Sequence, residues 1–245
     1  MSFARPKLIP WLFFLSAMAL TLALGTWQIA RLQWKTDLIA HIERAKTEAP
    51  LPALPANDQL AAHEFTRVAL AGTWVPGVEF HVTPRYYKDK LGYHLFVPLK
   101  LADGRSVLVN RGWVPADRKN PETRPESIAK GKVSLVGMIR IGQDRNYFTP
   151  PSQPQKNIWF GRDVTQMAET ENLQNLAPAT VDAIGIPDAT RLPIPFDGEI
   201  RLYNQHLSYV FTWYGIALAV LVIFLVYHYK RPDEVSLHTR DSTRP

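Results

Sequence analysis

Two groups of side chains, one toward each end of the chain, have the residue types of a haem-binding site. His206, Tyr209 and Trp213 are spaced so that they share one face of a helix. A neutral imidazole at the edge of a low-dielectric slot can ligate haem iron, which makes His206 the candidate metal ligand. The second group consists of aromatic and cationic side chains at helical spacing, with an amide beside them. The spaced residues are Trp27, Arg31, Trp34 and Lys35, and the adjacent amide is Gln28.

In this interpretation the aromatic side chains flank a porphyrin, and Arg31, Lys35 or Arg201 pairs with its propionates at the level of the water. The candidate cofactor-binding residues are His206, Tyr209, Trp213, Trp27, Gln28 and Arg31. A plainer interpretation stays open beside it. Trp and Tyr belts and snorkelling cationic side chains anchor many membrane helices at the interface without binding any ligand.

The rest of the sequence contains no motif of enzyme chemistry. There is no phosphate-binding glycine loop, no GxSxG elbow and no HExxH zinc helix, so we expect a protein that is not an enzyme. Cysteine is absent, which excludes disulfides and thiolate metal sites, and the four Met residues form no cluster for copper. His81 and His94 lie on expected strands and could approach each other. Two histidines make a weak metal site, and ordinary hydrogen-bonding histidines are the alternative.

The elements that must position the two groups are apolar segments near the ends of the chain. Residues 8–30 and 207–229 each run for 23 residues without a formal charge, enough to cross about 30 Å of hydrocarbon. The first segment is too long for the core of a cleaved signal peptide, so we expect a retained anchor. Helix-forming residues continue it to about residue 48, where a proline-rich stretch ends the helix.

The charge distribution predicts how these helices are oriented. The chain has a formal charge of +6 and a pI of about 9.5, and part of the excess flanks the apolar segments at Arg5, Lys7, Lys230 and Arg231. The positive-inside rule then places both termini, including the short tail 230–245, in the cytoplasm and the middle of the chain outside it. No Lys/Arg stripe interleaved with aromatic residues is present, so we expect no nucleic-acid partner.

The middle of the chain, residues 56–204, has the sequence pattern of a β domain. Short apolar or alternating runs bounded by Gly, Pro, Asp or Asn predict strands at 66–75, 78–84, 93–101, 105–114 and 132–141. Asp103-Gly104 is a two-residue hairpin signal, and Asp163 with Gln166 can cap a short helix over 164–170. The predicted fold class is an α+β membrane protein. Two transmembrane helices flank one mainly antiparallel, sheet or barrel-like, extracytoplasmic domain.

Four stretches of the sequence resemble the Surfeit locus protein 1 family in its bacterial branch. They are LGTWQIARLQWK (24–35), GTWVP (72–76), GYHLFVPLKLADGRSVLVNRGWVP (92–115) and YNQHLSYVFTWYGIALA (203–217). They span nearly the whole chain in the expected order. The resemblance implies that His206 occupies the position of the proposed haem ligand. The paired asparagines usual before that position are Asn204-Gln205 here, so the sequence departs from the family pattern at Gln205.

The resemblance further implies a role in assembling haem-copper cytochrome c oxidase in the bacterial inner membrane. It implies haem a as the cofactor. The implied partners are the catalytic subunit of the oxidase and the machinery that synthesises haem a. Arg111, Gly112 and Trp113 match the motif of the soluble domain, where Gly112 would permit a tight backbone position and Trp113 would fill the core.

Three hypotheses for function follow. The leading one is an assembly factor that holds or hands over haem a, with His206 as an axial ligand. The second is a scaffold that stabilises an oxidase intermediate without binding haem. The third is an extracytoplasmic sensor, which the sequence disfavours because only about 14 residues follow Arg231 and they hold no output domain.

Overall fold

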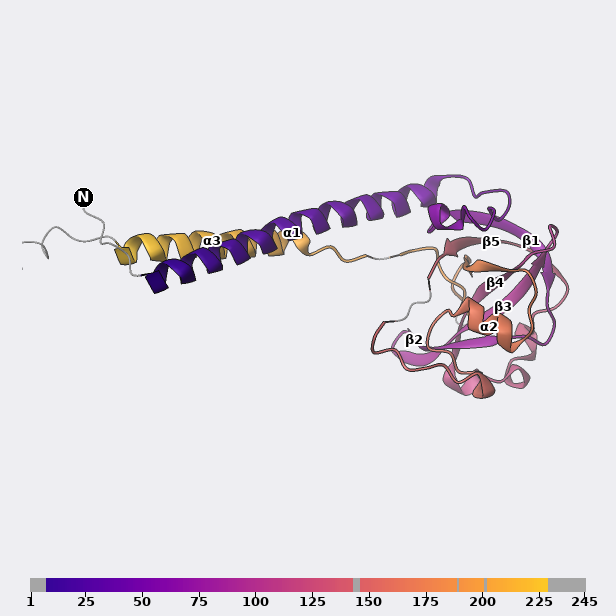
Figure 1. Cartoon of the computed structure of the whole chain (residues 1–245). Helices are drawn as coiled ribbons and strands as arrows, with labels where there is room; N and C mark the ends of the chain where they lie inside the picture. Colours follow the sequence, from indigo (N-terminus) through magenta and orange to yellow (C-terminus); the bar gives the residue numbers. More distant parts are fainter. Residues whose placement is uncertain (1–7, 143–145, 189, 201, 229–245) are drawn as a thin grey trace, which may run out of the picture. The chain divides into compact units, whose positions relative to one another are not determined.

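The structure is a computed structural model, and it describes residues 8–142, 146–188, 190–200 and 202–228 (Figure 1). Its α-helices are α1 (Leu8–Thr47), α2 (Val164–Thr170) and α3 (His206–His228). Its strands are β1 (Arg67–Trp74), β2 (Phe80–Tyr87), β3 (Lys90–Leu101), β4 (Ser106–Pro115), β5 (Lys132–Arg140) and β6 (Leu176–Ala183). Single turns of 3-10 helix connect them: η1 (Leu60–His63), η2 (Ala116–Arg118), η3 (Pro121–Thr123), η4 (Pro125–Ser127) and η5 (Pro154–Lys156).

The chain divides into a helical unit, residues 1–40 with 202–245, and a domain unit, residues 41–201. In the helical unit the first part of α1 and α3 run antiparallel. Phe14 stacks on Phe224 with ring centroids 4.0 Å apart, and farther along α1 the hydroxyls of Thr26 and Tyr214 lie 3.3 Å apart. A Cβ at Gly25 would lie 3.1 Å from the Tyr214 ring, so the missing side chain allows the helices to approach closely at this level.

Both helices meet the physical requirements for crossing a membrane. Among the described residues, α1 and α3 are the two helices that are long enough and apolar enough, with 40 and 23 residues. The predicted segments at 8–30 and 207–229 fall within or on these helices; Tyr229 lies outside the described residues, as do the flanking charges Arg5, Lys7, Lys230 and Arg231. The α+β fold class, with one apolar helix before and one after a sheet domain in the sequence, is confirmed.

The domain unit is built on a six-stranded sheet that closes on itself. The strand order is β1-β5-β6-β4-β3-β2, and β1 also pairs with β3, so five strands form a ring and β2 extends it from β3. Every pairing is antiparallel except β4 with β6. The sequence predicted a mainly antiparallel domain that is either a sheet or barrel-like. The domain is barrel-like, and one of its strand pairs is parallel.

The local signals in the sequence identify most elements but not β6. The Asp103-Gly104 turn joins β3 to β4, with Gly104 at a φ of 85°, and Asp163 caps α2 by accepting a hydrogen bond from the Gln166 backbone N–H at 3.1 Å. Strand β6 was not predicted because it contains Pro178, which normally interrupts a ladder. The register of β4 and β6 shifts between Ser106 and Leu108, and this irregularity accommodates the exposed proline.

Strand β4 separates two apolar clusters because it is buried on both faces. Val107 and Val109 point into the larger cluster, which fills the barrel, whereas Leu108 joins a smaller cluster on the opposite face. The smaller cluster is Phe80, Val82, Phe96, Leu108, Trp159 and Met167. Asn110 has the same parity on β4 as Leu108, so its side chain is directed to the outer face of the barrel.

The domain unit begins earlier in the chain than residue 56. The last turns of α1 belong to it, since Ile42 and Ala45 are buried. His41 Nε2 lies 3.0 Å from the backbone carbonyl of Glu64, and Arg67 donates to the backbone carbonyl of Lys46 at 3.0 Å. The C-terminal end of α1 is thus part of the folded domain, held by both packing and hydrogen bonds.

Candidate functional site

The two groups singled out in the sequence are joined by one short hydrogen bond. His206 Nδ1 lies 2.7 Å from Gln28 Oε1, and this bond links the first turn of α3 to the middle of α1. Gln28 is 8% exposed and His206 is half-buried. A buried amide beside apolar helices needs a partner, because leaving it unsatisfied costs on the order of 1–3 kcal/mol. The histidine ring supplies that partner.

This hydrogen bond determines which nitrogen of the ring can act as a ligand. An amide oxygen only accepts, so with the amide assigned in this orientation His206 Nδ1 carries the proton. In the neutral ring the lone pair then lies on Nε2, and no described residue forms a hydrogen bond to that atom. An imidazole whose other nitrogen donates to a fixed acceptor is the usual arrangement of a metal-ligating histidine.

The residues just before α3 determine that the helix begins at His206. Asn204 Oδ1 accepts a hydrogen bond from the His206 backbone N–H at 3.4 Å, and Asn204 Nδ2 reaches Thr36 Oγ1 on α1 at 3.5 Å. The Gln205 carbonyl accepts from the backbone N–H of Ser208, whereas the Gln205 side chain is exposed. Of the two residues Asn204 and Gln205, Asn204 therefore positions the histidine. The sequence alone did not assign this role to Asn204.

Within the described part of the chain, the other predicted site residues form no hydrogen bond, ion pair or ring contact with the histidine. The Arg31 guanidinium lies over the Trp34 ring on its own helix, 3.9 Å from the ring centroid. Trp27 and Tyr209 are 56% and 50% exposed, and Trp213 is half-buried. Lys35 is half-buried as well, and Arg201 lies outside the described residues. Gln28 and His206 are in direct contact; the grouping of Arg31 and Trp213 with them stays a prediction.

The predicted approach of His81 to His94 is wrong. His81 pairs with Leu95 and His94 pairs with Val82 across β2 and β3, so the two histidines point to opposite faces of the sheet. The His94 Nδ1 atom lies 3.4 Å from the Asn110 side-chain nitrogen instead. No group of three His, Asp or Glu side chains among the described residues could hold a metal ion.

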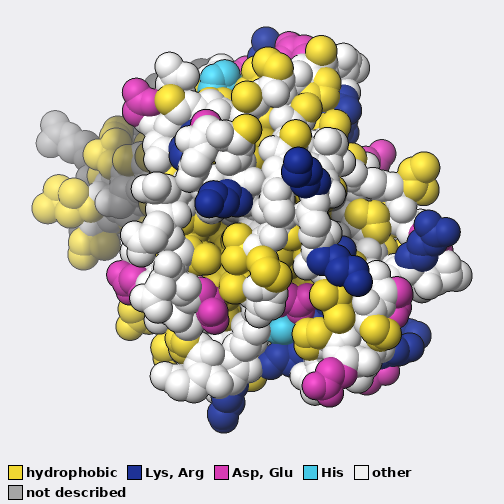
Figure 2. All heavy atoms as spheres, turned by 90° about the vertical axis from the view of Figure 1, so that its right-hand side faces the viewer, with side chains coloured by type: hydrophobic (Ala, Val, Ile, Leu, Met, Phe, Trp, Pro, Cys, Tyr) yellow, Lys and Arg dark blue, Asp and Glu magenta, His cyan; other side chains and the backbone are white. Residues whose placement is uncertain are grey.

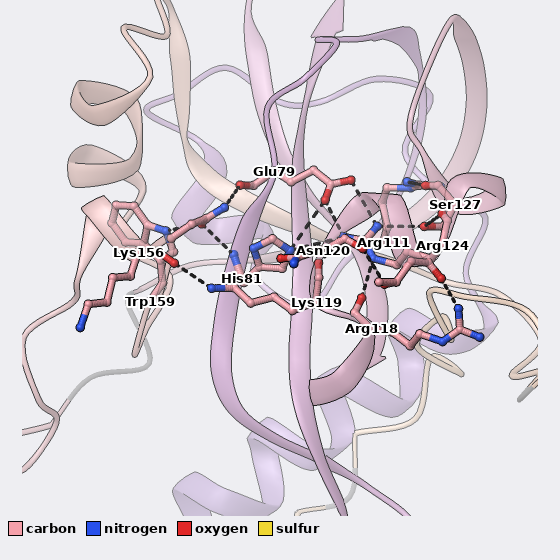
Figure 3. Close-up of polar contacts among 12 residues, drawn as sticks. Glu79, His81, Arg111, Arg118, Lys119, Asn120, Arg124, Ser127, Lys156 and Trp159 are labelled. Atoms are coloured by element: carbon pink, nitrogen blue, oxygen red, sulfur yellow. Dashed lines mark hydrogen bonds and ion pairs between the residues drawn. The ribbon is translucent and has the colours of Figure 1, made fainter.

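A buried charged network ties the connection after β4 to β2 (Figure 3). Arg124 is fully buried and its guanidinium contacts Glu79 at 2.6 and 3.3 Å, Ser127 Oγ at 2.8 Å and the carbonyls of Arg118 and Lys119 at 3.0 Å each. These donors are all satisfied within the fold. The network therefore holds η2, η3 and η4 against the barrel rather than presenting a reactive group.

His81 and Arg111 complete this network. His81 Nε2 lies 3.4 Å from an Arg124 nitrogen and 3.7 Å from a Glu79 oxygen. Burial, opposed by Glu79 and reinforced by Arg124 and Lys119, lowers the pKa of His81 to about 4, so the ring is neutral near pH 7. Burial likewise lowers the pKa of the Arg111 guanidinium, which donates to the backbone carbonyl of Ser127.

The motif that includes Gly112 and Trp113 makes a close backbone contact. Gly112 has a φ of 131°, and a Cβ there would overlap the Ile194 carbonyl oxygen. Trp113 and Ile194 exchange two backbone hydrogen bonds, at 2.7 and 2.8 Å. The Trp113 ring is 6% exposed and its indole N–H donates to the Arg85 carbonyl at 3.1 Å. The structure thus supplies the tight position expected of Gly112 and the buried ring expected of Trp113.

These features define a class of protein with two apolar helices of membrane-spanning length, a β-barrel domain between them in sequence, and a Gln–His pair that joins the helices. The SURF1 family model matches residues 15–218. Surfeit locus protein 1 of Mus musculus is 34% identical over 223 residues, covering 84% of this chain and 72% of the relative. The Homo sapiens protein of that name is 34% identical over 213 residues, covering 80% and 70%.

A SURF1-like protein of Monosiga brevicollis is 35% identical over 224 residues, which covers 86% of this chain and 84% of the relative. The family model covers the barrel domain and most of α1, and it ends within α3. The chain belongs to the SURF1 family.

Proposed function

We propose that this chain is an assembly factor for haem-copper cytochrome c oxidase that binds haem a through His206. Membership of the SURF1 family supports the assembly role. The observation that carries the haem step is the 2.7 Å contact between His206 Nδ1 and Gln28 Oε1, which leaves Nε2 as the ligating atom.

The residues present fit a haem better than they fit a bare metal ion. A haem iron takes its equatorial ligands from the porphyrin and needs only axial ligands from the protein, so one prepared imidazole is a sufficient donor. The surroundings also suit a porphyrin, because α1 and α3 expose large apolar side chains along their lengths. His206 would hold the iron, Gln28 would keep the ring in its tautomer, and Trp213 would pack beside the macrocycle. When bound, haem a is the group delivered for electron transfer and oxygen chemistry in the oxidase.

The same proposal places the protein in a bacterial cell membrane, with both termini in the cytoplasm and the barrel domain in the periplasm. Its support is the pair of apolar helices together with the cationic residues that flank them in the sequence. A topology reporter fused after Pro245 should be active in the cytoplasm only, and one inserted at Asn120 only outside it. The reverse pattern would overturn the orientation.

Haem binding is tested by co-expressing the full chain with a haem a biosynthesis pathway, purifying it in mild detergent and recording the reduced visible spectrum. We expect stoichiometric haem a in the wild type and its loss in His206→Ala. His228→Ala is the matched control, because His228 lies at the opposite end of the same helix and bonds the Phe224 carbonyl at 2.9 Å. This control should retain haem.

The role of Gln28 is tested in the same preparation. Gln28→Leu removes the acceptor of the Nδ1 proton and should weaken haem binding by roughly 10- to 100-fold, whereas Gln28→Glu keeps an acceptor and should retain most of it. Equal haem content in wild type and His206→Ala would overturn the ligand assignment. Retained support of oxidase assembly by His206→Ala would then favour the second hypothesis, a scaffold that works without haem.

A further inference from the structure

An apolar hollow lies at the end of the helical unit that is opposite His206. It has a volume of about 220 Å³, and its walls come from the first turns of α1 and the last turns of α3, which run side by side (Figure 1). None of the described residues that line it is Asp, Glu, Lys or Arg. The face of the barrel domain in Figure 2 is different, because charged side chains are scattered there among apolar ones.

Aromatic packing gives this hollow a fixed shape. Phe14 stacks on Phe224 across the two helices, and Trp11 meets Phe224 edge to face with ring centroids 5.1 Å apart. The His228 ring packs on Phe224 at 4.2 Å between centroids and against Tyr227 at 5.0 Å. The walls are therefore formed by contacts within the helical unit itself, as in the largely preformed sites that bind small molecules.

His228 is the polar side chain of the hollow, and the backbone holds one of its nitrogens. The residue is 6% exposed, and its Nδ1 lies 2.9 Å from the Phe224 carbonyl oxygen. A carbonyl oxygen only accepts, so Nδ1 carries the proton and, in the neutral ring, the lone pair lies on Nε2. No described residue forms a hydrogen bond or ion pair with Nε2. A buried acceptor without a donor costs about 1–3 kcal/mol, so an occupant that brings a donor is favoured.

The apolar walls determine which kind of donor fits the hollow. An ordered water molecule needs about two to four polar partners, and the walls offer it little beyond the imidazole. A lipid acyl chain matches the walls but has no donor for Nε2. A flat ring that carries a hydroxyl group satisfies both requirements, because its face packs on aromatic side chains and its O–H donates.

The size and location of the hollow narrow the ligand further. Its volume is below the roughly 300–1,000 Å³ of pockets that hold drug-sized ligands, so it admits one ring and not a porphyrin. Both helices have membrane-spanning length, so an occupant reaches the hollow through lipid and must be soluble in it.

We propose that this hollow binds a lipid-soluble phenol, which is an aromatic ring that carries a hydroxyl group and an apolar chain. The hydroxyl donates to His228 Nε2, the ring lies against Phe14 and Phe224, and the chain extends into the surrounding lipid. His206 and His228 are the first and last residues of the 23-residue α3. The phenol site is therefore separate from the haem site, and the two proposals stand or fall independently.

Three probes test this site on the full chain in lipid nanodiscs. 4-Nonylphenol has the ring, the hydroxyl and the chain. 4-Nonylanisole replaces the O–H donor by a methyl ether, and 4-nonylcyclohexanol keeps the hydroxyl on a ring that is not flat. Affinities are measured by ¹⁹F NMR of a ring-fluorinated 4-nonylphenol, directly or by displacement. We expect each comparison probe to bind at least about fivefold more weakly than 4-nonylphenol.

Nitrogen NMR of the ¹⁵N-histidine-labelled chain tests the hydrogen bond itself. The chain contains seven histidines, and the His228 signals are those that disappear in His228→Phe. We expect a protonated Nδ1 and an unprotonated Nε2 before titration. 4-Nonylphenol should move the Nε2 signal, saturably, toward the position of a hydrogen-bonded nitrogen. A His228 spectrum that does not change at saturating 4-nonylphenol would overturn the proposal.

Two variants locate the binding. His228→Phe keeps a ring but removes the acceptor, and it should weaken 4-nonylphenol by about fivefold or more. Val220→Phe fills the hollow while the imidazole stays in place, and it should weaken binding by roughly tenfold or more. Val222→Phe is the matched control and should bind as the wild type does, because Val222 is on the same helix, 48% exposed and outside the lining.

The two variants change different properties of the hollow, so one decides the matter if circular dichroism shows that the other has lost helix. Weaker binding in a variant with wild-type helix content supports the site. Affinity that is unchanged in such a variant, or equal binding of the anisole or the cyclohexanol, would overturn the proposal.

Discussion

The buried histidine of the domain network predicts an acid-sensitive fold. His81 is 3% exposed and sits beside Arg124, and its pKa is lowered from 6.5 to about 4. Between these two values the unfolded chain binds a proton at this position and the folded chain does not. Stability therefore rises with pH across the window. The contribution is complete above pH 6.5 and is lost progressively as the pH falls toward 4.

The size of the effect follows from the shift. One pKa unit corresponds to about 1.4 kcal/mol, so lowering the pH from about 7.5 to about 4.5 should cost about 2 to 3 kcal/mol of the free energy of unfolding through His81 alone. The carboxyls of Asp103 and Asp188 have pKa values below their ordinary value of 3.8. Their contributions are lost at still lower pH and do not overlap this window.

The assay is urea unfolding of the full chain in detergent across this pH range, with and without His81→Gln. The glutamine keeps an acceptor for Arg124 but does not titrate, so the variant should lose most of the pH slope. His63→Gln, on η1, removes a histidine outside the network and should keep the slope. A slope as steep in His81→Gln as in the wild type would refute the assignment of the acid sensitivity to His81.

Three further changes test the domain by the same unfolding assay. Gly112→Ala forces a Cβ into a neighbouring carbonyl at a positive φ, and it should lower the free energy of unfolding by about 3 kcal/mol. Gly104→Ala is also at a positive φ but in open space, so it should lower the free energy of unfolding by only about 1 kcal/mol. Equal losses in the two variants would contradict this reasoning. Glu79→Gln leaves the buried Arg124 charge unpaired and should cost about 3 kcal/mol; a loss below about 1 kcal/mol would contradict it. Asp163→Ala removes a helix cap and should cost about 1 kcal/mol, and an unchanged stability would contradict it.

The His206 site requires only that α3 begin beside Gln28, a condition met within the helical unit by one short hydrogen bond.

Local patterns in the sequence were sufficient for most elements. Uncharged runs of membrane-spanning length identified α1 and α3, and bounded apolar runs located β1 to β5, because these signals depend on neighbouring residues alone. Strand β6 could not be identified from local patterns, because Pro178 is a local signal against a strand. Only its pairing with β4 and β5 shows that residues 176–183 form a strand.

For the candidate site, the sequence alone identified Gln28 and His206 as candidate cofactor-binding residues and suggested that His206 ligates iron. It could not show that these two side chains touch, or that the amide selects Nε2 as the free nitrogen, because 178 positions separate them.

His81 and His94 show a second limit of sequence reasoning. Both were placed on strands, but only the pairing register shows that they point to opposite faces of the sheet. The buried pair of Glu79 and Arg124 was also beyond local reasoning. The two residues are 45 positions apart in the sequence, and only the folded domain brings their charges together.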